Sequence, residues 1–401
     1  MSVVVQKYGG TSLATPERIA SVADRIVAIK KEGHQVAVVV SAMGETTDEL
    51  AALAHRISKA PPKRELDMLL TAGERIAMAL LAMAINDRGC KALSFTGSQS
   101  GIITDTEHTN AKIVEIRADR IQEALQKGQI AIVAGFQGMS TEREITTLGR
   151  GGSDTTAVAL AIALEAKECQ IFTDVDGVYS ADPRIIGEAR KLDWITYEEM
   201  MELSSLGVQV LHPRSVELAA KHDLPILVAS SLENKQGTIV EQKTSLEAVR
   251  VRGIASDLKV VLFTLVSVPR KTHGVSQLVV DLAKQGVPIK LFFHGASGKT
   301  SVDLLFLVGE EHAQKAKGVL SKASKRLRAK GFLQNDTVGT VSIVGLGIGR
   351  EPEILASLFQ AAAKLRAHIE AVSTSEIKIT CVLPRDKVVP AAKALHKTFK
   401  L

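Results

Sequence analysis

Short runs of apolar residues alternate with longer segments of helical periodicity through the first 245 residues of the chain. Continuous apolar runs rich in valine and isoleucine are typical of strands that are buried on both faces of a parallel sheet. The segments between them carry the apolar spacing of helices that cover such a sheet. The pattern therefore predicts a two-sided α/β domain over residues 1–245. The predicted strands are residues 3–5, 36–40, 92–95, 130–134, 169–173 and 225–228, and the predicted helices are residues 16–31, 65–87, 112–127 and 153–164.

The pattern changes after residue 245, where the order strand, helix, strand, strand, helix occurs twice. Two such units of about seventy residues indicate a pair of ferredoxin-like modules, at residues 246–330 and 331–401. The glycines and polar residues of 329–339 are interpreted as the connector between them. A large first domain followed by paired small modules suggests an enzyme with a regulatory tail. The predicted strands are residues 260–268, 287–293, 301–308, 340–346, 368–373 and 376–383, and the predicted helices are residues 274–285, 351–365, 387–399 and one that begins at 311.

The composition is that of a globular protein, with 45% hydrophobic and 23% charged residues among 401. Aromatic residues make up only 3%, and the net charge of +6 is spread along the chain, so we expect anionic small substrates and no nucleic acid partner. Three widely spaced cysteines indicate reduced thiols, without a disulfide framework or metal-ligand spacing. The longest apolar run, residues 76–85, is too short to span a bilayer, and no secretory signal is recognisable. A cytoplasmic protein without a membrane partner is expected.

The segment KYGGTS, residues 7–12, directly follows the first predicted strand. Gly9 and Gly10 would let the backbone approach a phosphate closely, and successive N–H groups can form an anion-binding nest. Lys7 adds a positive charge that suits a β- or γ-phosphate. An ordinary strand-to-helix turn has similar glycines, so both interpretations remain open at this point. The segment is not a P-loop, because that pattern has four residues between two glycines and then Lys and Ser or Thr, and it does not occur here.

Hydroxyl and carboxylate side chains follow in two further places. Ser41 comes directly after the second strand, with Thr47 shortly beyond it. Either hydroxyl can bind a substrate, but both are also ordinary turn residues. Glu74 and Arg75 lie inside an apolar helix, where they form either a solvated face or, in the case of Glu74, a partner for a substrate ammonium group. Taken alone, each of these two segments is better explained by a turn or a solvated helix face than by ligand binding.

The strongest signal is the segment GRGGSDTT, residues 149–156, at the start of a predicted helix. The planar guanidinium of Arg150 can bind a carboxylate through two hydrogen bonds. The helix that begins near Ser153 directs its positive end to the same place. Ser153 or Asp154 could simply cap this helix, but glycines on both sides of an arginine favour an anion-binding function.

A second loop, TDVDGVY at residues 173–179, follows a strand and ends in acidic and aromatic residues, with Asp182 and Arg184 close behind. Contacts to ribose, to a base and to a metal-bound phosphate would all use side chains of these types. An Asp-Gly turn followed by an Asp-Pro turn would explain the same residues without a ligand.

In this order, KYGGTS, GER at residues 73–75, GRGGSD and TDVDGVY resemble the bacterial aspartokinases, and STSEI at residues 373–377 resembles the second ACT domain of that family. The resemblance implies an α/β amino-acid kinase fold, mainly a parallel sheet sandwiched by helices, followed by two ferredoxin-like βαββαβ ACT modules. It also implies phosphoryl transfer from ATP, with Mg²⁺, to the β-carboxylate of L-aspartate. The product would be 4-phospho-L-aspartate, formed in the first step of lysine, threonine and methionine biosynthesis.

The site residues of the family carry over to matching positions. An aspartate side chain has a reference pKa near ~3.9 and is ionised at neutral pH, so the reaction needs positioning and charge neutralisation rather than a general base. The resemblance implies Lys7 and Asp154 as catalytic residues and no metal ligand from the protein. The implied aspartate contacts are Ser41, Thr47, Glu74, Arg150 and Ser153, and the implied nucleotide contacts are Lys7, Gly9, Gly10, Thr173, Asp174, Tyr179, Arg184 and the residue at position 209.

The chain departs from the family in two respects, one in the kinase domain and one in the first ACT module. A lysine is usual where this chain has Gln209, so we expect weaker ATP binding or slower turnover unless Arg214 or Lys221 supplies the missing charge. In the first ACT module, PRKTHG at residues 269–274 stands in place of an Asp-Lys-Pro-Gly turn. His294 and Gly295 stand in place of a Gln-Asn pair that helps to hold an amino-acid effector. The departures predict that feedback inhibition is altered or lost.

The resemblance implies lysine or threonine, or both, as the effector. Its candidate contacts are His294, Asp303, Ser373 and Glu376. Because ACT modules commonly pair across subunits, a homo-oligomer is expected. Kinases of glutamate, acetylglutamate, carbamate or nucleoside monophosphates remain alternatives within the fold. A regulatory subunit whose kinase domain is weak or inactive is the alternative of a different class, and Gln209 would be its sign.

Overall fold

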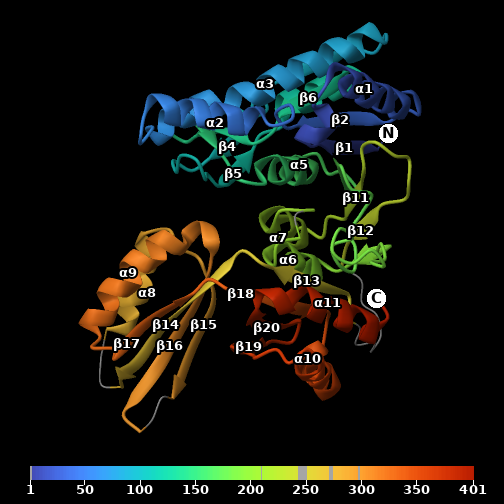
Figure 1. Ribbon diagram of the computed structural model, residues 1–401. Coiled ribbons are helices and arrows are strands. Elements are labelled where there is room, and N and C mark those ends of the chain that lie inside the picture. Colours follow the sequence, from blue (N-terminus) through green and yellow to red (C-terminus); the bar gives the residue numbers. More distant parts are fainter. Residues whose placement is uncertain (1, 209, 243–250, 271–273, 297–298) are drawn as a thin grey trace. The chain divides into compact units, whose positions relative to one another are not determined.

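The computed structural model describes residues 2–208, 210–242, 251–270, 274–296 and 299–401 (Figure 1). The chain divides into two compact units, Met1–Tyr179 with Lys191–Leu246 and Ser180–Arg190 with Glu247–Leu401. The short segment Ser180–Arg190 belongs to the second unit because Ala181 and Ile186 pack in its core.

An eight-stranded sheet forms the centre of the first unit. Neighbouring strands are parallel except for one antiparallel pair near an edge, so the predicted, mainly parallel sheet is confirmed. The strand order is β10 (Trp194–Ile195), β12 (Thr238–Val240), β11 (Ile226–Ser230), β9 (Cys169–Thr173), β1 (Val3–Tyr8), β2 (Gln35–Val40), β6 (Ile130–Ala134) and β3 (Ala92–Phe95).

Helices cover both faces of this sheet. Two long helices, α1 (Pro16–Lys31) and α3 (Lys63–Asp87), pack together on one face, and α5 (Gly152–Ala163) contacts the central strands on the other (Figure 1). The helix α1 begins where the sequence predicts, because the Thr15 side chain accepts a hydrogen bond from Arg18 N and caps the helix. The other elements are η1 (Gly10–Leu13), α2 (Thr46–Ile57), α4 (Asp119–Gln126), α6 (Tyr197–Ser205) and α7 (Pro213–Lys221).

Among the described residues, α3 is the one helix that is long and apolar enough to cross a membrane. Half of that segment is buried within the fold. Its residues Leu81 and Ile85 lie in the main core beside Val36 and Val38 of β2. It therefore has the surroundings of the core helix of a globular domain.

The prediction of one helix over residues 112–127 is wrong. A strand, β5 (Ile113–Ile116), occupies the first part of this segment, and α4 occupies the rest. The strand is rich in β-branched residues and pairs with the neighbouring β4, so β propensity and pairing outweigh the helical spacing. The resulting small sheet has the order β5, β4 (Ile102–Thr104), β7 (Gln137–Ser140) and β8 (Ile145–Thr147).

Two four-stranded sheets form the second unit, each packed against two helices, and the predicted pair of ferredoxin-like modules is confirmed. The first has the order β15 (Ile289–Ala296), β16 (Ser301–Gly309), β14 (Val260–Pro269) and β17 (Gly331–Asn335), with helices α8 (Val275–Lys284) and α9 (Ala313–Arg326). The second has the order β13 (Gly253–Asp257), β18 (Val338–Val344), β20 (Lys378–Pro384) and β19 (Ala371–Thr374), with helices α10 (Pro352–Lys364) and α11 (Arg385–Phe399).

The prediction of an irregular connector over residues 329–339 is wrong in part, because β17 lies there and completes the first sheet by pairing with β14. Phe332 of this strand stacks on Phe263, with 5.9 Å between ring centroids, so an apolar contact outweighs the surrounding glycines. The strand β13 was not predicted, and it pairs with β18 of the second sheet although it lies within the residues predicted for the first module. The three-part division of the chain at residues 245 and 330 stays a prediction.

Candidate active site

The predicted binding loops begin at one edge of the large sheet. The strand β1 lies between β2 and β9 and runs parallel to both, with Tyr8 level with Val40 and Phe172, so the carboxyl ends of the three strands coincide. Backbone hydrogen bonds fasten the loops where they begin. Gly9 N donates to Phe172 O at 3.2 Å, and Ser41 N donates to Tyr8 O at 3.1 Å.

Lys7 and Asp154 form an ion pair at this edge, with 2.7 Å between Nζ and Oδ1. Their side chains are only 12% and 11% exposed, and partial shielding from water strengthens the attraction. Asp154 lies in the first turn of α5, where the positive end of the helix favours a carboxylate. A Cβ added to Gly9 would lie 3.5 Å from Lys7 Nζ, so the glycine loop faces the same ammonium group. The two predicted catalytic residues thus lie together.

Gly10 is required by the close approach of two loops. A Cβ at this position would lie 2.8 Å from Ala42 O and 2.9 Å from Gly44 O, which no larger residue tolerates. Gly44 N also donates to Gly10 O at 3.0 Å. The loop after β1 is therefore held against the loop after β2, which contains Ser41.

Glu74 of α3 reaches the same loop. Its side chain is buried, and its Oε1 accepts a hydrogen bond from Ala42 N at 3.2 Å. Its Oε2 is buried without a hydrogen-bond partner among the described residues. Burial raises the pKa of Glu74 to about 7. A buried, half-paired carboxyl group is energetically unfavourable, and it suits a ligand that brings a positive charge.

The other predicted substrate contacts lie on three elements. Ser41 is half-buried at the end of β2, and Thr47 is half-buried in the first turn of α2. Arg150 is exposed in the turn between β8 and α5, and Ser153 is buried in the first turn of α5. The exposed guanidinium of Arg150 is accessible to a ligand carboxylate.

The loop after β9 contains the predicted nucleotide contacts. Thr173 Oγ1 donates to Asp174 Oδ1 at 3.0 Å. Tyr179 Oη donates to Asp176 Oδ1 at 2.7 Å, and this hydrogen bond raises the pKa of Tyr179 to about 12. Lys191 lies 3.7 Å from the other oxygen of Asp176. The carboxylate of Asp176 therefore holds the hydroxyl group of Tyr179 within this loop.

The remaining two predicted nucleotide contacts are Arg184 and Gln209, and the described part of the first unit contains neither. Arg184 belongs to the second unit, and its guanidinium donates to both carboxylate oxygens of Asp182, at 3.0 Å from Nε and 2.8 Å from Nη2. Gln209 lies outside the described residues.

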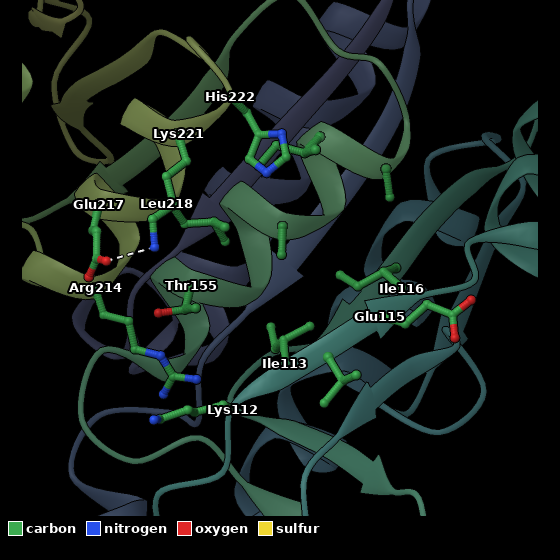
Figure 2. Close-up of a pocket in the computed structure, with 14 residues that line it drawn as sticks. Lys112, Ile113, Glu115, Ile116, Thr155, Arg214, Glu217, Leu218, Lys221 and His222 are labelled. Atoms are coloured by element: carbon green, nitrogen blue, oxygen red, sulfur yellow. Dashed lines mark hydrogen bonds and ion pairs between the residues drawn. The ribbon is translucent and has the colours of Figure 1, made fainter.

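The two cations suggested as replacements for the missing lysine charge are engaged elsewhere. Arg214 donates to Leu148 O at 2.9 Å and to Ala111 O at 2.7 Å. Lys221 Nζ donates to Glu217 Oε1 at 2.8 Å. Both line a cavity of about 660 Å³ formed by β5, α5 and α7 (Figure 2). None of the predicted site residues lines this cavity, so the structure gives no support to either replacement.

One of the four predicted effector contacts, His294, lines a cavity formed by described residues. His294 borders a space of about 460 Å³ in the first module, together with Arg270 and Val275. Asp303 Oδ1 instead accepts a hydrogen bond from Ser267 N at 2.7 Å. In the second module Ser373 lies on β19, and Glu376 forms an exposed ion pair with Arg350 at 2.9 Å. The cavity beside His294 is thus the candidate effector site of the first module.

The sequence analysis missed two polar residues that contact the segments around Arg150. His212 caps α7 by accepting a hydrogen bond from Arg214 N at 3.3 Å, and burial lowers its pKa. Its ring packs against Gly151. Asp67 of α3 is fully buried. An acid among the apolar positions of a helix is a signal that could have identified Asp67, whereas no sequence feature distinguished His212.

Comparison with known proteins gives relatives over the full length of the chain. A sequence model described as the amino acid kinase family matches residues 2–230, and one described as an ACT domain matches residues 341–399. The chain is 44% identical to aspartokinase 2 of Bacillus subtilis over 403 residues, which cover all of this chain and 98% of that protein. It is 45% identical to the aspartokinase of Corynebacterium glutamicum over 407 residues, which cover all of this chain and 97% of that protein.

Solved structures show the same architecture. The aspartate kinase from Synechocystis is 39% identical with a TM-score of 0.56, and the match covers all of this chain and 70% of that one. Aspartokinase III of E. coli, in complex with aspartate and ADP, matches over the whole of both chains with a TM-score of 0.83. At 23% identity, this second likeness shows the shared fold alone.

Proposed function

Because this chain belongs to the aspartokinase family, we propose that its first unit transfers the γ-phosphoryl group of ATP to the β-carboxylate of L-aspartate. The product is 4-phospho-L-aspartate. Identity of 44% and 45% to named aspartokinases over the full chain supports this reaction. The observation that carries the site assignment is the buried carboxyl group of Glu74, whose Oε2 has no hydrogen-bond partner in the described part of the chain and whose Oε1 binds the loop beside the glycine segment.

The assignment of the aspartate contacts follows from charge. L-Aspartate brings an ammonium group and two carboxylates. We assign the ammonium to Glu74, whose Oε2 is buried without a partner among the described residues. We assign the α-carboxylate to Arg150, because a guanidinium can bind a carboxylate through two hydrogen bonds. Ser41, Thr47 and Ser153 would complete the site with hydroxyl groups.

Lys7 and the glycine loop face the proposed position of the transferred phosphoryl group. The ammonium of Lys7 lies next to Gly9 and is held by Asp154 at 2.7 Å. A positioned cation is useful here because both the nucleophile and the phosphates are anionic, and phosphoryl transfer depends on positioning and charge stabilisation. Asp154 therefore acts by orienting Lys7, aided by the helix end that it occupies.

The nucleotide is expected to bind as its magnesium complex. Mg²⁺ retains several waters and is commonly bound by substrate phosphates with one or two carboxylates, and Asp174 at the end of β9 offers a carboxylate of the right chemistry. When bound, the ion would neutralise charge on the phosphates. Thr173, Asp174 and Tyr179 are assigned to the nucleotide together with Lys7, Gly9 and Gly10.

Regulation is assigned to the second unit. A structure of E. coli aspartokinase III with lysine and aspartate is described as the T-state, and it supports an amino-acid effector for this fold. We place that effector in the cavity beside His294, with lysine or threonine as candidates. The edge strands β15 and β19 could pair with those of another copy, which would give a homo-oligomer. A cytoplasmic location remains our expectation.

The experiment that tests the assignments is a comparison of Michaelis constants. Arg150→Ala and Glu74→Ala should raise the KM for aspartate by about 100-fold or more, because each removes a charged contact, and should change the KM for ATP little. An unchanged KM for aspartate would reject the assignment of that residue. Trapping of aspartyl phosphate as its hydroxamate distinguishes an active kinase from a regulatory subunit.

A further inference from the structure

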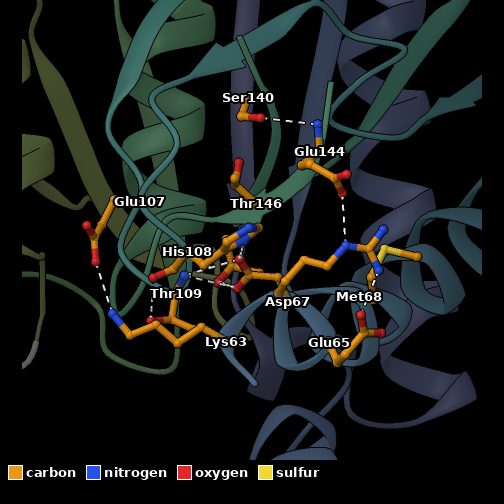
Figure 3. Close-up of polar contacts among 12 residues, drawn as sticks. Lys63, Glu65, Asp67, Met68, Glu107, His108, Thr109, Ser140, Glu144 and Thr146 are labelled. Atoms are coloured by element: carbon orange, nitrogen blue, oxygen red, sulfur yellow. Dashed lines mark hydrogen bonds and ion pairs between the residues drawn. The ribbon is translucent and has the colours of Figure 1, made fainter. Parts of the chain in front are cut away.

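A buried carboxylate joins a loop to the end of the strand β8, just before the turn that contains Arg150. Asp67 is 0% exposed on α3. Its Oδ1 accepts a hydrogen bond from Thr147 Oγ1 at 2.6 Å. Both of its oxygens lie 3.1 Å from Thr109 N (Figure 3). His108 Nδ1 lies 2.6 Å from its Oδ2. Buried carboxylates are tolerated when they are paired in this way, and removal of one partner leaves the others unsatisfied.

One of these partners has a strained backbone. Thr109 has φ of 69°, in the left-handed region that a β-branched residue rarely adopts. The N–H of Thr109 is the group that the carboxylate of Asp67 binds. Strained residues of this kind persist where surrounding contacts hold them, and they are frequent at functional sites. Asp67 thus holds a conformation that the segment would not favour by itself.

The held segment packs directly against the turn that carries Arg150. Ala111 N donates to Thr147 O at 2.9 Å. A Cβ added to Gly149 would lie 2.9 Å from Asn110 Oδ1 and 3.1 Å from Thr109 O, so the two loops are in contact immediately before Arg150. Any shift of residues 108–111 is therefore transmitted to the arginine.

A half-buried cation on another helix binds the same region of the chain. Arg214 of α7 donates to Ala111 O at 2.7 Å and to Leu148 O at 2.9 Å. Asp67 and Arg214 therefore bind the 108–111 segment and the end of β8 through groups of opposite charge. Neither side chain is among the residues assigned to aspartate or ATP.

We infer that Asp67 is a positioning residue for aspartate binding, because it joins the 108–111 segment to the end of β8, and these two segments set the place of Arg150. The inference rests on the proposed role of Arg150. The carboxylate of Asp67 acts through Thr147 and Thr109 and does not itself contact the substrate. Its loss should therefore impair recognition of aspartate and spare the nucleotide side of the site, which lies on other strands.

The test uses the full-length chain and a matched pair at position 147. Thr147→Val removes the hydroxyl that Asp67 binds, whereas Thr147→Ser keeps it. We expect Thr147→Val and Asp67→Asn each to raise the KM for aspartate about tenfold, with the KM for ATP and kcat changed less than about twofold. Thr147→Ser should keep the KM for aspartate near that of the unmodified chain. In Asp67→Asn, the further change Thr109→Gly should recover part of the loss, because glycine adopts positive φ without strain.

Arg150→Ala, measured in parallel, separates this inference from the assignment on which it rests. If Arg150→Ala raises the KM for aspartate but Thr147→Val and Asp67→Asn do not, the positioning role is wrong and the assignment stands. Equal increases in both Michaelis constants would also overturn it, because they would indicate general loss of structure. If Arg150→Ala leaves the KM for aspartate unchanged, both fail. Should Asp67→Asn not fold, the position 147 pair decides the question.

Discussion

The replacement of Glu74 by glutamine should weaken the binding of aspartate and at the same time stabilise the folded protein. Glu74 is buried, with one oxygen bonded to Ala42 N and the other without a partner among the described residues. Burial raises its pKa from an ordinary value of 4.5 to about 7. Glu74→Gln keeps the shape of the side chain and removes its charge and its titration.

The raised pKa predicts a pH dependence for aspartate binding. Only the ionised form of Glu74 can pair with the ammonium group of aspartate. With a pKa of about 7, the ionised fraction falls from roughly nine-tenths at pH 8 to roughly one-tenth at pH 6. The KM for aspartate should therefore rise about tenfold between pH 8 and pH 6, and it should lose this dependence in Glu74→Gln, where it is high throughout.

The same shift predicts the opposite effect on stability. Between pH 4.5 and about 7, the folded chain keeps the Glu74 proton that the unfolded chain has released, so the free energy of unfolding falls as the pH rises. Above pH 7 the full penalty, about 3 kcal/mol, applies. Glutamine buries an amide that offsets part of the gain. We expect Glu74→Gln to be more stable by about 1 to 3 kcal/mol at pH 8, and by much less at pH 4.5.

Denaturant unfolding at pH 4.5 and pH 8 without substrate measures the stability effect, and initial rates at pH 6, 7 and 8 measure the effect on KM. Glu65→Gln is the matched control, because Glu65 is an exposed acid in the first turn of the same helix. The KM for ATP over the same pH range controls for other titrations. The reasoning would be refuted by a stability difference that does not grow with pH, or by a KM for aspartate that stays constant from pH 8 to pH 6.

Three further predictions concern single positions or the effector. Gly151→Ala should lower the free energy of unfolding by about 3 kcal/mol or more, because the φ of Gly151 is 69° and the new Cβ would lie 2.1 Å from His212 Cγ. An unchanged Tm in thermal unfolding would contradict this prediction. Gln209→Lys should lower the KM for ATP or raise kcat by restoring a positive charge, and no change in either would refute the idea. Threonine at low concentration should inhibit weakly or not at all in a steady-state assay, and strong inhibition would show that the altered first module still responds.

The sequence predicted six of the eight strands of the large sheet and the helices α1, α3 and α5, because these strands are continuous apolar runs and these helices have a clear apolar spacing. Thr15 and Pro16 place the start of α1, and it ends at Lys31 as predicted. The segment 112–127 was misassigned because its apolar spacing fits a helix, while pairing with β4 decides in favour of a strand. β17 was missed because its stabilising contact, Phe332 on Phe263, joins residues far apart in the sequence.

The candidate site was predictable where chemistry and spacing coincide. Lys7 and Asp154 are 147 positions apart, yet parallel pairing of strands and a helix start bring them to 2.7 Å. The sequence could not show that Glu74 is buried without a full set of partners, since that depends on how α3 packs against the loop at Ala42. Nor could it show the role of Asp67, whose partners come from a loop and a strand that are distant in the sequence.

The central claim, phosphoryl transfer to the β-carboxylate of aspartate at the Lys7 and Asp154 pair, is tested most directly by trapping the product. Purified chain, L-aspartate, ATP, Mg²⁺ and hydroxylamine should yield aspartyl hydroxamate. Formation should require both substrates, and Lys7→Ala should reduce the rate about 100-fold or more, as expected for loss of a positioned charge. Absence of hydroxamate from the unmodified chain, or an undiminished rate in Lys7→Ala, would contradict the account.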